Sequence, residues 1–258
     1  MIDLYHYSLL SILLVGLAVV LIAGEIGWQL GVRAEGRGGE NIATLEAAVL
    51  GLLALIIGFT FAMALTRFEA RRDAVVNEAN AIGTTALRAR LLPEPQRTET
   101  LKLLREYVQI RLDIVKSELS LAEHPAIIDR SNALQELLWQ QAKAVAAKDN
   151  AVVPTGLFIQ TLNEMIDSQG RRLAALRNRI PNSVQLSLFA IAAVASAFAG
   201  YASGLETRRT RLPVYLLGLV VCAVLVLILD LDRPTAGFIK VSQQPMIDTA
   251  ASIAAFSD

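Results

Sequence analysis

Four long stretches of the sequence contain no Asp, Glu, Lys or Arg, and these stretches predict the framework of the protein. They cover residues 4–24, 47–66, 180–205 and 212–229. Crossing a hydrocarbon core of about 30 Å takes roughly 20 helical residues at 1.5 Å each. None of the four shows the polar stripe typical of a helix on a soluble core. We therefore expect four transmembrane helices, the first of them retained as a span because no Lys or Arg precedes it.

The segment between the second and third stretches has the periodicity of amphipathic helices. The second stretch continues without a strong breaker until Pro93 and Pro95, so we expect one helix that runs well beyond the membrane. Apolar residues then recur at helical spacing at positions 101, 104, 108, 112, 115 and 119, and again at 159, 162, 166, 173, 176 and 180. Gln169 interrupts the second seam, where it either sets the register between helices or reaches out to water.

These patterns define a fold class and a division of the chain. No stretch alternates at period two for long enough to predict a strand. We expect an all-α membrane protein with four transmembrane helices per subunit and a cytosolic helical bundle, the second span extending into the cytosol. Residues 1–66 hold the first two spans, 67–180 the cytosolic helical domain, 181–233 the last two spans, and 234–258 a cytosolic C-terminal tail that packs on the bundle.

The distribution of Lys and Arg near the span ends predicts the orientation. An even number of spans places both termini and the central segment on one side of the membrane. That side carries nine Lys and Arg residues, at positions 67, 71, 72, 171, 172, 177, 179, 233 and 240. The other side carries five, at positions 33, 37, 208, 209 and 211. Because positive charge favours the cytosolic side, we expect cytosolic termini and a cytosolic central domain.

Composition excludes several functional classes. The 258 residues include 24 basic and 24 acidic ones, so bulk charge gives no reason to expect nucleic acid as a partner. One cysteine, Cys222, and two histidines, His6 and His124, are too few for a zinc or iron–sulfur centre. The chain has no glycine-rich phosphate loop, nucleophile elbow or metalloprotease His/Glu motif. We expect no enzymatic activity, no metal and no cofactor.

The second span carries the pattern of a helix that lines a narrow axis. Gly51 and Gly58 lie seven residues apart, and alanines at positions 47, 54 and 62 add further small side chains. Small residues let helices approach closely. Beyond the apolar stretch, polar residues lie on one helical face: Asp73, Asn77, Asn80 and Thr84. Such a face would line a cytosolic vestibule, or it would be an ordinary solvated surface.

Two carboxylates border the first two spans and are candidates for a pore mouth. Glu25 lies near the end of the first apolar stretch, and Glu46 lies at the start of the second. Ionisable groups at such positions are costly and often functional. In an oligomer the two could ring a pore and concentrate cations. The alternative is that each carboxylate reaches interfacial water or pairs with Arg33 or Arg37.

The third and fourth spans contain residues that predict helix packing and anchoring. Small residues at positions 190, 193, 197 and 200 follow one face of the third span and predict close helix packing. The fourth span ends in Asp230, Asp232 and Arg233, where Arg233 is spaced to pair with Asp230. We interpret this end as a structural anchor in preference to a ligand site.

Seven segments carry a resemblance to a known family. They are GLLALIIGFTF at 51–61, RFEARR at 67–72, NEANAIG at 77–83, LREY at 104–107, DLDRP at 230–234, GFIKVS at 237–242, and PM at 245–246. Together these segments resemble a bacterial family of bestrophin-like membrane proteins. The resemblance covers most of the chain. It implies kinship with bestrophins, which are pentameric anion channels with four spans per subunit and a helical cytosolic part. It also implies that the second span lines the pore with a neck of large apolar residues four apart, a spacing that Ile57, Phe61 and Leu65 have here.

We therefore expect an oligomeric ion channel of the bacterial inner (plasma) membrane. Its selectivity is open, because the resemblance implies anions whereas an acidic mouth implies cations. The expected partners are further copies of the chain (a pentamer by family resemblance), the lipid bilayer and inorganic ions, with no nucleic acid. The alternative is a non-conducting scaffold or sensor whose cytosolic bundle binds another protein. A transporter ranks last, because the spans show neither an internal repeat nor polar groups at the midplane.

Overall fold

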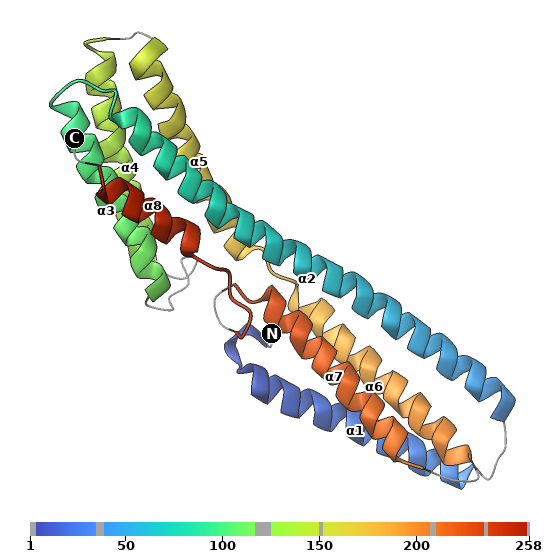
Figure 1. The fold of residues 1–258 in the computed structure, drawn as a ribbon. Coiled ribbons are helices and arrows are strands. Elements are labelled where there is room, and N and C mark those ends of the chain that lie inside the picture. Colours follow the sequence, from blue (N-terminus) through green and yellow to red (C-terminus); the bar gives the residue numbers. More distant parts are fainter. Residues whose placement is uncertain are drawn as a thin grey trace. The chain divides into compact units, whose positions relative to one another are not determined.

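The computed structural model describes residues 4–34, 39–116, 125–149, 152–206, 210–234 and 237–256 (Figure 1). No strand occurs in these ranges, which confirms the all-α fold. The α-helices are α1 (Leu9–Arg33), α2 (Gly39–Ala89), α3 (Gln96–Lys116), α4 (Pro125–Ala146), α5 (Leu157–Arg177), α6 (Asn182–Leu205), α7 (Leu212–Asp232) and α8 (Gln244–Ala254). Short helical turns at Leu4–His6 and Val152–Gly156 precede α1 and α5.

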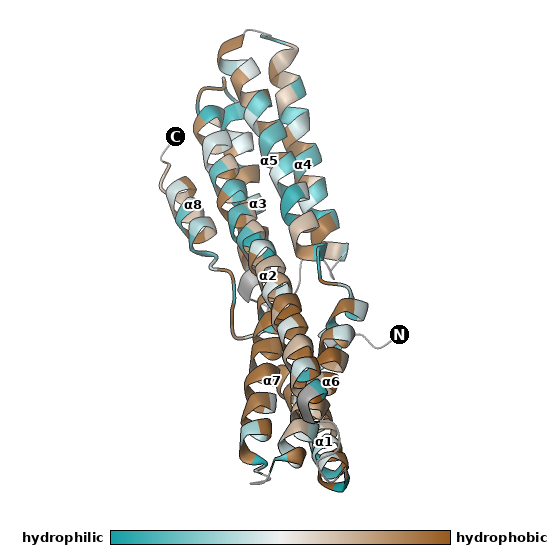
Figure 2. Cartoon of the chain, turned by 90° about the vertical axis from the view of Figure 1, so that its right-hand side faces the viewer, coloured by the Kyte–Doolittle hydropathy of each residue, from teal (hydrophilic) through white to brown (hydrophobic). Residues whose placement is uncertain are grey.

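Among the described residues, four helical stretches are long and apolar enough to cross a membrane, as the sequence predicts. They lie in α1, in α2, in α7 and in the stretch Val152–Leu205, which contains α6. Figure 2 shows α1, α6, α7 and one part of α2 as predominantly hydrophobic, whereas hydrophilic residues alternate along α3, α4 and α5. Since α2 ends only at Ala89, the expectation of an extended second span is confirmed.

The chain forms two compact units, and α2 contributes to both. The membrane unit comprises Met1–Thr66, Arg179–Arg233 and Gly237–Ile239. The bundle unit comprises Arg67–Asn178, Pro234–Ala236 and Lys240–Asp258. The boundary between the units therefore lies inside α2, between Thr66 and Arg67.

In the membrane unit, α1 and α6 approach until their backbones touch. A Cβ atom added to Gly27 would lie 2.0 Å from the carbonyl oxygen of Ala197. One added to Gly200 would lie 2.1 Å from the carbonyl oxygen of Gly24. The same close approach recurs one turn further along, at Gly31 and Gly204. The close packing predicted for the third span is confirmed, and its partner is a row of glycines on the first.

The bundle unit encloses one apolar core built from five helices. Its fully buried side chains include Ile82 of α2, Leu104 of α3, Leu138 of α4, Phe158 of α5 and Met246 of α8. Because these helices are amphipathic, their apolar faces meet in the interior while their charged faces remain in water.

The C-terminal helix α8 closes one side of this core. Arg105 of α3 donates hydrogen bonds to the carbonyl oxygens of Ile253 and Phe256. Thr249 of α8 donates to the carbonyl oxygen of Ala79 in α2. The two Arg105 bonds satisfy carbonyl groups at the last turn of α8 and just beyond it, where no following turn can bond them.

Replacing Gly27 by Ala should destabilise the membrane unit by about 1–3 kcal/mol, because the added methyl group would overlap the backbone of α6. The measurement is the unfolding midpoint of the purified protein in detergent. Gly170→Ala in α5 is the control, since a Cβ there would meet no described atom within 4 Å. That substitution should stabilise by about 0.5–1 kcal/mol through helix propensity. Equal tolerance of both would contradict the tight α1–α6 contact.

Candidate functional site

One face of α2 packs inside the membrane unit. Leu53, Thr60 and Ala64 are buried, at spacings of seven and four residues that place them on one side of the helix. Leu50 and Leu53 border a space of only about 10 Å³ together with residues of the other three spans, among them Val20, Ser196 and Gly218. This side of α2 therefore faces a small space that it shares with α1, α6 and α7.

The opposite face of α2 is not covered by the residues that the structure describes. Gly51, Leu55, Gly58 and Ala62 are all exposed. A Cβ atom added to Gly51 or Gly58 would meet no described atom within 4 Å. The glycines of α2 thus differ from those of α1, where every added Cβ would collide with a neighbour. The exposed face can accept the close approach of another helix or face a narrow axis.

The residues expected to form a neck lie at different positions around the axis of α2, each further from the buried face than the one before. A step of four residues advances a helix by about 40°, so a spacing of four drifts around the axis. Ile57 and Phe61 are half-buried, and Leu65 is 37% exposed. Phe59, which lies on the other side of α2 from Phe61, is 65% exposed. Two large aromatic side chains therefore point to different sides of the same turn.

Glu25 belongs to a paired cluster at one end of the membrane unit. The Tyr215 hydroxyl donates to one of its carboxylate oxygens at 2.7 Å, and Arg211 donates to the other at 3.2 Å. The Arg211 guanidinium also stacks 3.7 Å from the centre of the Trp28 ring. The cation beside Glu25 is thus Arg211, which comes from a connection distant in sequence. Arg37, considered as a partner from sequence, lies outside the described residues.

Glu46 has a different environment. Its side chain is half-buried at the start of the apolar part of α2. The charge of Glu206, at the end of α6, acts on it repulsively. Two acidic residues of the membrane unit, Glu46 and Glu206, therefore lie near each other at this end.

The polar residues predicted for a vestibule lie on the exposed side of α2 in the bundle unit. Asp73, Asn77, Asn80 and Thr84 are all exposed. The last three border a polar cleft of about 500 Å³ between α2 and α5, together with Ala81, Thr161, Glu164 and Arg171. Arg171 and Glu164 form an ion pair within α5. Asp73 is not part of this cleft and lies 3.7 Å from Arg72.

The acidic end of α7 anchors the chain on both sides. Asp232 accepts hydrogen bonds from the backbone N–H of Ile180, at 2.8 Å, and from the hydroxyl of Tyr5. Asp230 accepts from the backbone N–H groups of Phe238 and Ile239, at 2.9 and 3.1 Å. Both carboxylates thus fix neighbouring backbone, as expected of a structural anchor.

Arg233 and Gly237 complete this anchor. Arg233 donates to the carbonyl oxygen of Tyr7 at 2.7 Å, a contact to the N-terminal segment that the sequence did not predict. A Cβ atom added to Gly237 would lie 2.0 Å from a carboxylate oxygen of Asp230. The glycine is required here because the backbone passes directly over the carboxylate.

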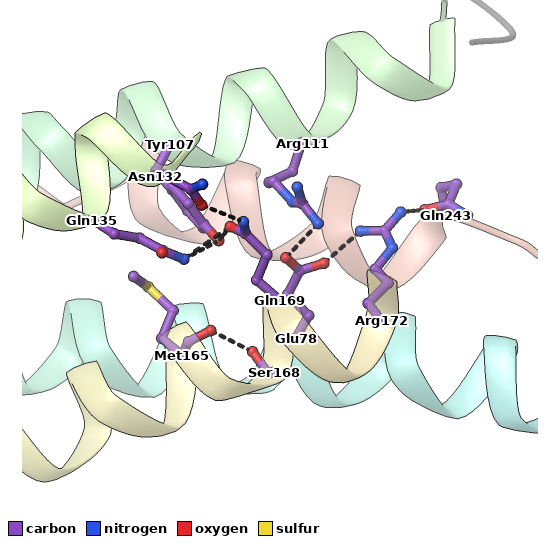
Figure 3. Close-up of polar contacts among 10 residues, drawn as sticks. All are labelled: Glu78, Tyr107, Arg111, Asn132, Gln135, Met165, Ser168, Gln169, Arg172 and Gln243. Atoms are coloured by element: carbon purple, nitrogen blue, oxygen red, sulfur yellow. Dashed lines mark hydrogen bonds and ion pairs between the residues drawn. The ribbon is translucent and has the colours of Figure 1, made fainter. Parts of the chain in front are cut away.

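Three charged residues meet in the interior of the bundle unit, and sequence reasoning missed them as a group (Figure 3). Glu78 of α2 accepts from Arg172 of α5 at 2.5 Å and pairs with Arg111 of α3 at 2.8 Å. Their exposed fractions are 0%, 4% and 1%. Arg172 also donates to Gln243, just before α8, at 2.9 Å. The triad thus joins α2, α3 and α5 to the C-terminal segment.

A neutral polar network continues from the triad. The Tyr107 hydroxyl donates to Gln169 at 2.6 Å, and Gln135 of α4 donates to the same Gln169 oxygen at 2.8 Å. Gln169 in turn donates to Asn132 at 3.2 Å. Gln169 is therefore buried and sets the register among three helices, which confirms the first interpretation and excludes a side chain in water.

Burial and neighbouring charge act in opposite directions on Glu78. Desolvation by itself disfavours the carboxylate, but the guanidinium groups of Arg111 and Arg172 outweigh it and lower the pKa of Glu78. Burial also raises the pKa of Tyr107 far above its ordinary value, so its hydroxyl remains a donor. The sequence signal that could have found the triad is a charged residue inside an apolar seam, as Arg111 is between Val108 and Leu112.

Comparison with known proteins identifies the family. The profile of the Bestrophin-like domain matches residues 9–246. The chain belongs to the Bestrophin-like family. A search of curated proteins found no match to this Bestrophin-like chain.

Solved structures with the same fold come from a bacterial bestrophin homologue of Klebsiella pneumoniae. A structure phased with zinc has 16% sequence identity and a TM-score of 0.65, and 95% of each chain is covered. A variant of that homologue has 14% identity and a TM-score of 0.71, with 93% of this chain and 97% of the other covered. At these identities the likeness establishes the bestrophin fold, so this Bestrophin-like chain is a multi-pass membrane protein.

Replacing Glu78 by Gln should lower the stability of the protein by about 3–5 kcal/mol, because it removes the carboxylate that pairs with two buried guanidinium groups. The unfolding midpoint in detergent measures this loss. The control is Glu106→Gln, which removes an exposed ion pair to Arg130 and should cost about 1 kcal/mol or less. Similar effects of the two substitutions would contradict a structural role for the triad.

The Glu78→Gln substitution should also change how the stability of the protein depends on pH. Since the pKa of Glu78 is lower in the folded protein, its charge stabilises the fold above the ordinary carboxyl pKa of about 4.3. That contribution is lost as the pH falls from there toward the folded-state pKa. Part of the acid-induced loss of stability should therefore be absent in Glu78→Gln.

Proposed function

We propose that this protein forms a homo-oligomeric ion channel in the bacterial inner membrane, with α2 lining the pore. The observation that supports it most is the uncovered face of α2, where a Cβ atom added to Gly51 or Gly58 would meet no described atom within 4 Å. A single subunit with four spans has too few helices to enclose a wide path, and cyclic symmetry is the usual form of a homo-oligomer. In a ring of subunits, the side of α2 that runs from this face through Leu65 to Phe61 would turn to the shared axis. Family resemblance implies a pentamer.

The proposed topology follows from the distribution of positive charge. Both termini and residues 67–180 lie in the cytosol, residues 1–66 and 181–233 contribute the spans, and residues 234–258 form a cytosolic tail on the bundle. The exposed polar side chains Asp73, Asn77, Asn80 and Thr84 would then line a cytosolic vestibule. A hydrated ion can exchange water for amide and hydroxyl oxygens along such a face.

The proposed neck consists of Ile57, Phe61 and Leu65, and the proposed mouth of Glu46 and Glu25. A ring of large apolar side chains can gate a pore by excluding water. At the mouth, Arg211 neutralises Glu25, so the negative field comes from Glu46 and the neighbouring Glu206. An acidic mouth favours cations, whereas the family resemblance implies anions, and the reversal potential in a salt gradient decides between them.

A scaffold or sensor is the second candidate, and one observation favours it. Leu87 and Leu91, one turn apart at the end of α2 and just beyond it, are 54% and 55% exposed on the bundle unit. Exposed apolar residues at this spacing can dock a helix of another protein. In this case the purified protein would pass no current in either direction of voltage.

Ion-flux and single-channel recording in liposomes tests the channel. Phe61→Ala should raise the conductance if that side chain narrows the neck. Phe59→Ala is the matched control, because Phe59 lies on another side of the same helical turn. Both variants must first show the oligomeric mass of the wild type in detergent. A monomeric wild type would overturn the oligomer, and a larger effect of Phe59→Ala would move the neck to the uncovered face.

Neutralising the mouth should change selectivity without changing assembly. Glu46→Gln should shift the reversal potential in a salt gradient toward that of a more anion-permeable pore. Glu25→Gln should have a smaller effect, because Arg211 already compensates its charge. If neither substitution moves the reversal potential, the carboxylates are interfacial groups and do not form a pore mouth.

A further inference from the structure

The buried triad of the bundle unit has an excess of positive charge. Arg111 and Arg172 contribute two guanidinium groups, and Glu78 contributes one carboxylate. All three side chains are at least nine-tenths buried. A net buried charge of one is expensive unless a counter-charge accompanies it. Tyr107, the neighbouring titratable group, is neutral and cannot supply that charge.

Arg111 also has unused hydrogen-bond donors. Its Nη2 pairs with Glu78, but its Nε and Nη1 have no acceptor among the residues that the structure describes. The side chain is only 1% exposed, so bulk water does not satisfy them. Buried donors of this kind almost always have a partner, either protein, water or an ion.

A second orphaned donor lies at the same level of the bundle. The hydroxyl of Ser131 on α4 is fully buried and has no partner in the described part of the chain. Ser131 lies one turn before Gln135, and Arg111 lies one turn after Tyr107, the residue that Gln135 contacts. Helices α3 and α4 run in opposite directions (Figure 1). One turn forward along α3, from Tyr107 to Arg111, and one turn back along α4, from Gln135 to Ser131, therefore point in the same direction and bring Ser131 level with Arg111.

We propose that Arg111 and Ser131 hold a small monovalent anion of the halide class inside the bundle unit. The guanidinium Nε–H and Nη1–H groups and the serine hydroxyl all donate, so they suit a ligand that only accepts. One negative charge balances the one excess positive charge of the triad. A single water molecule could accept from only two of these donors and would leave that charge uncompensated, and a doubly charged phosphate would reverse the charge. The site lies in the bundle unit and does not depend on conduction by α2.

Anion-dependent stability of the full-length protein tests the site. The unfolding midpoint is measured in detergent at matched sodium concentration, with chloride or bromide against gluconate. We expect a saturable rise of the midpoint with either halide. Ser131→Ala should weaken halide affinity by about tenfold, the loss expected for a hydrogen bond to a charged group. Because this hydroxyl bonds no described residue, the variant should fold normally.

Two further variants separate a specific site from a general salt effect. Arg111→Gln should abolish the halide-dependent rise. Arg130→Gln, next to Ser131 but exposed, should leave it unchanged. Anomalous scattering from bromide in crystals should place the anion beside Arg111 and Ser131. No difference between halide and gluconate, an unchanged response in both Ser131→Ala and Arg111→Gln, or bromide only at other positions would overturn the proposal.

Discussion

The architecture of the membrane unit depends on the direct contact of two helix backbones. In a bilayer, lipid tails are as apolar as leucine, so helices gain little from hiding apolar side chains against each other. Close packing must therefore supply the free energy of helix association. At the α1–α6 contact it requires a glycine on α1, because a Cβ atom at Gly27 would lie 2.0 Å from the carbonyl oxygen of Ala197. The small residues of α1 and α6 thus face each other, whereas a Cβ atom added to Gly51 or Gly58 of α2 would meet no described atom within 4 Å.

The bundle unit relies on a different constraint, the cost of burying charge. Glu78 can occupy the interior only because Arg111 and Arg172 approach it from two other helices. The geometry is therefore specific: α2, α3 and α5 must all be in register for the carboxylate to be paired. Gln169 extends the same requirement to α4 through its bonds to Tyr107 and Gln135. The polar groups of this core thus fix the register of the helices, which apolar packing alone would specify less strictly.

Helix α2 takes part in the packing of both units. The part of α2 in the membrane unit has one face packed and one face open, and the part in the bundle unit carries Glu78 on its buried side and Asn77 and Asn80 on its exposed side. A helix with one packed and one exposed face can hold the fold together with the first and line a pathway with the second. If the oligomer forms as proposed, the open face of small residues and the exposed polar residues would follow one side of α2 along much of its length. The triad would then hold the helix that carries the pathway.

The sequence by itself determined the four spans, the extension of α2 and the all-α fold, because these follow from local hydrophobicity and helical periodicity. It also found Gln169 as an interruption of a seam and the acidic end of α7 as an anchor. It did not determine which charges pair: Glu25 meets Arg211, and Glu78 meets Arg111 and Arg172, across long separations in sequence. The buried face of α5 also includes Phe158 and Met165, whereas the apolar seam suggested Ile159 and Ile166, which are only half-buried. Only tertiary structure could decide these points, because pairing and burial depend on how helices from distant segments pack, and local periodicity carries no information about the partner.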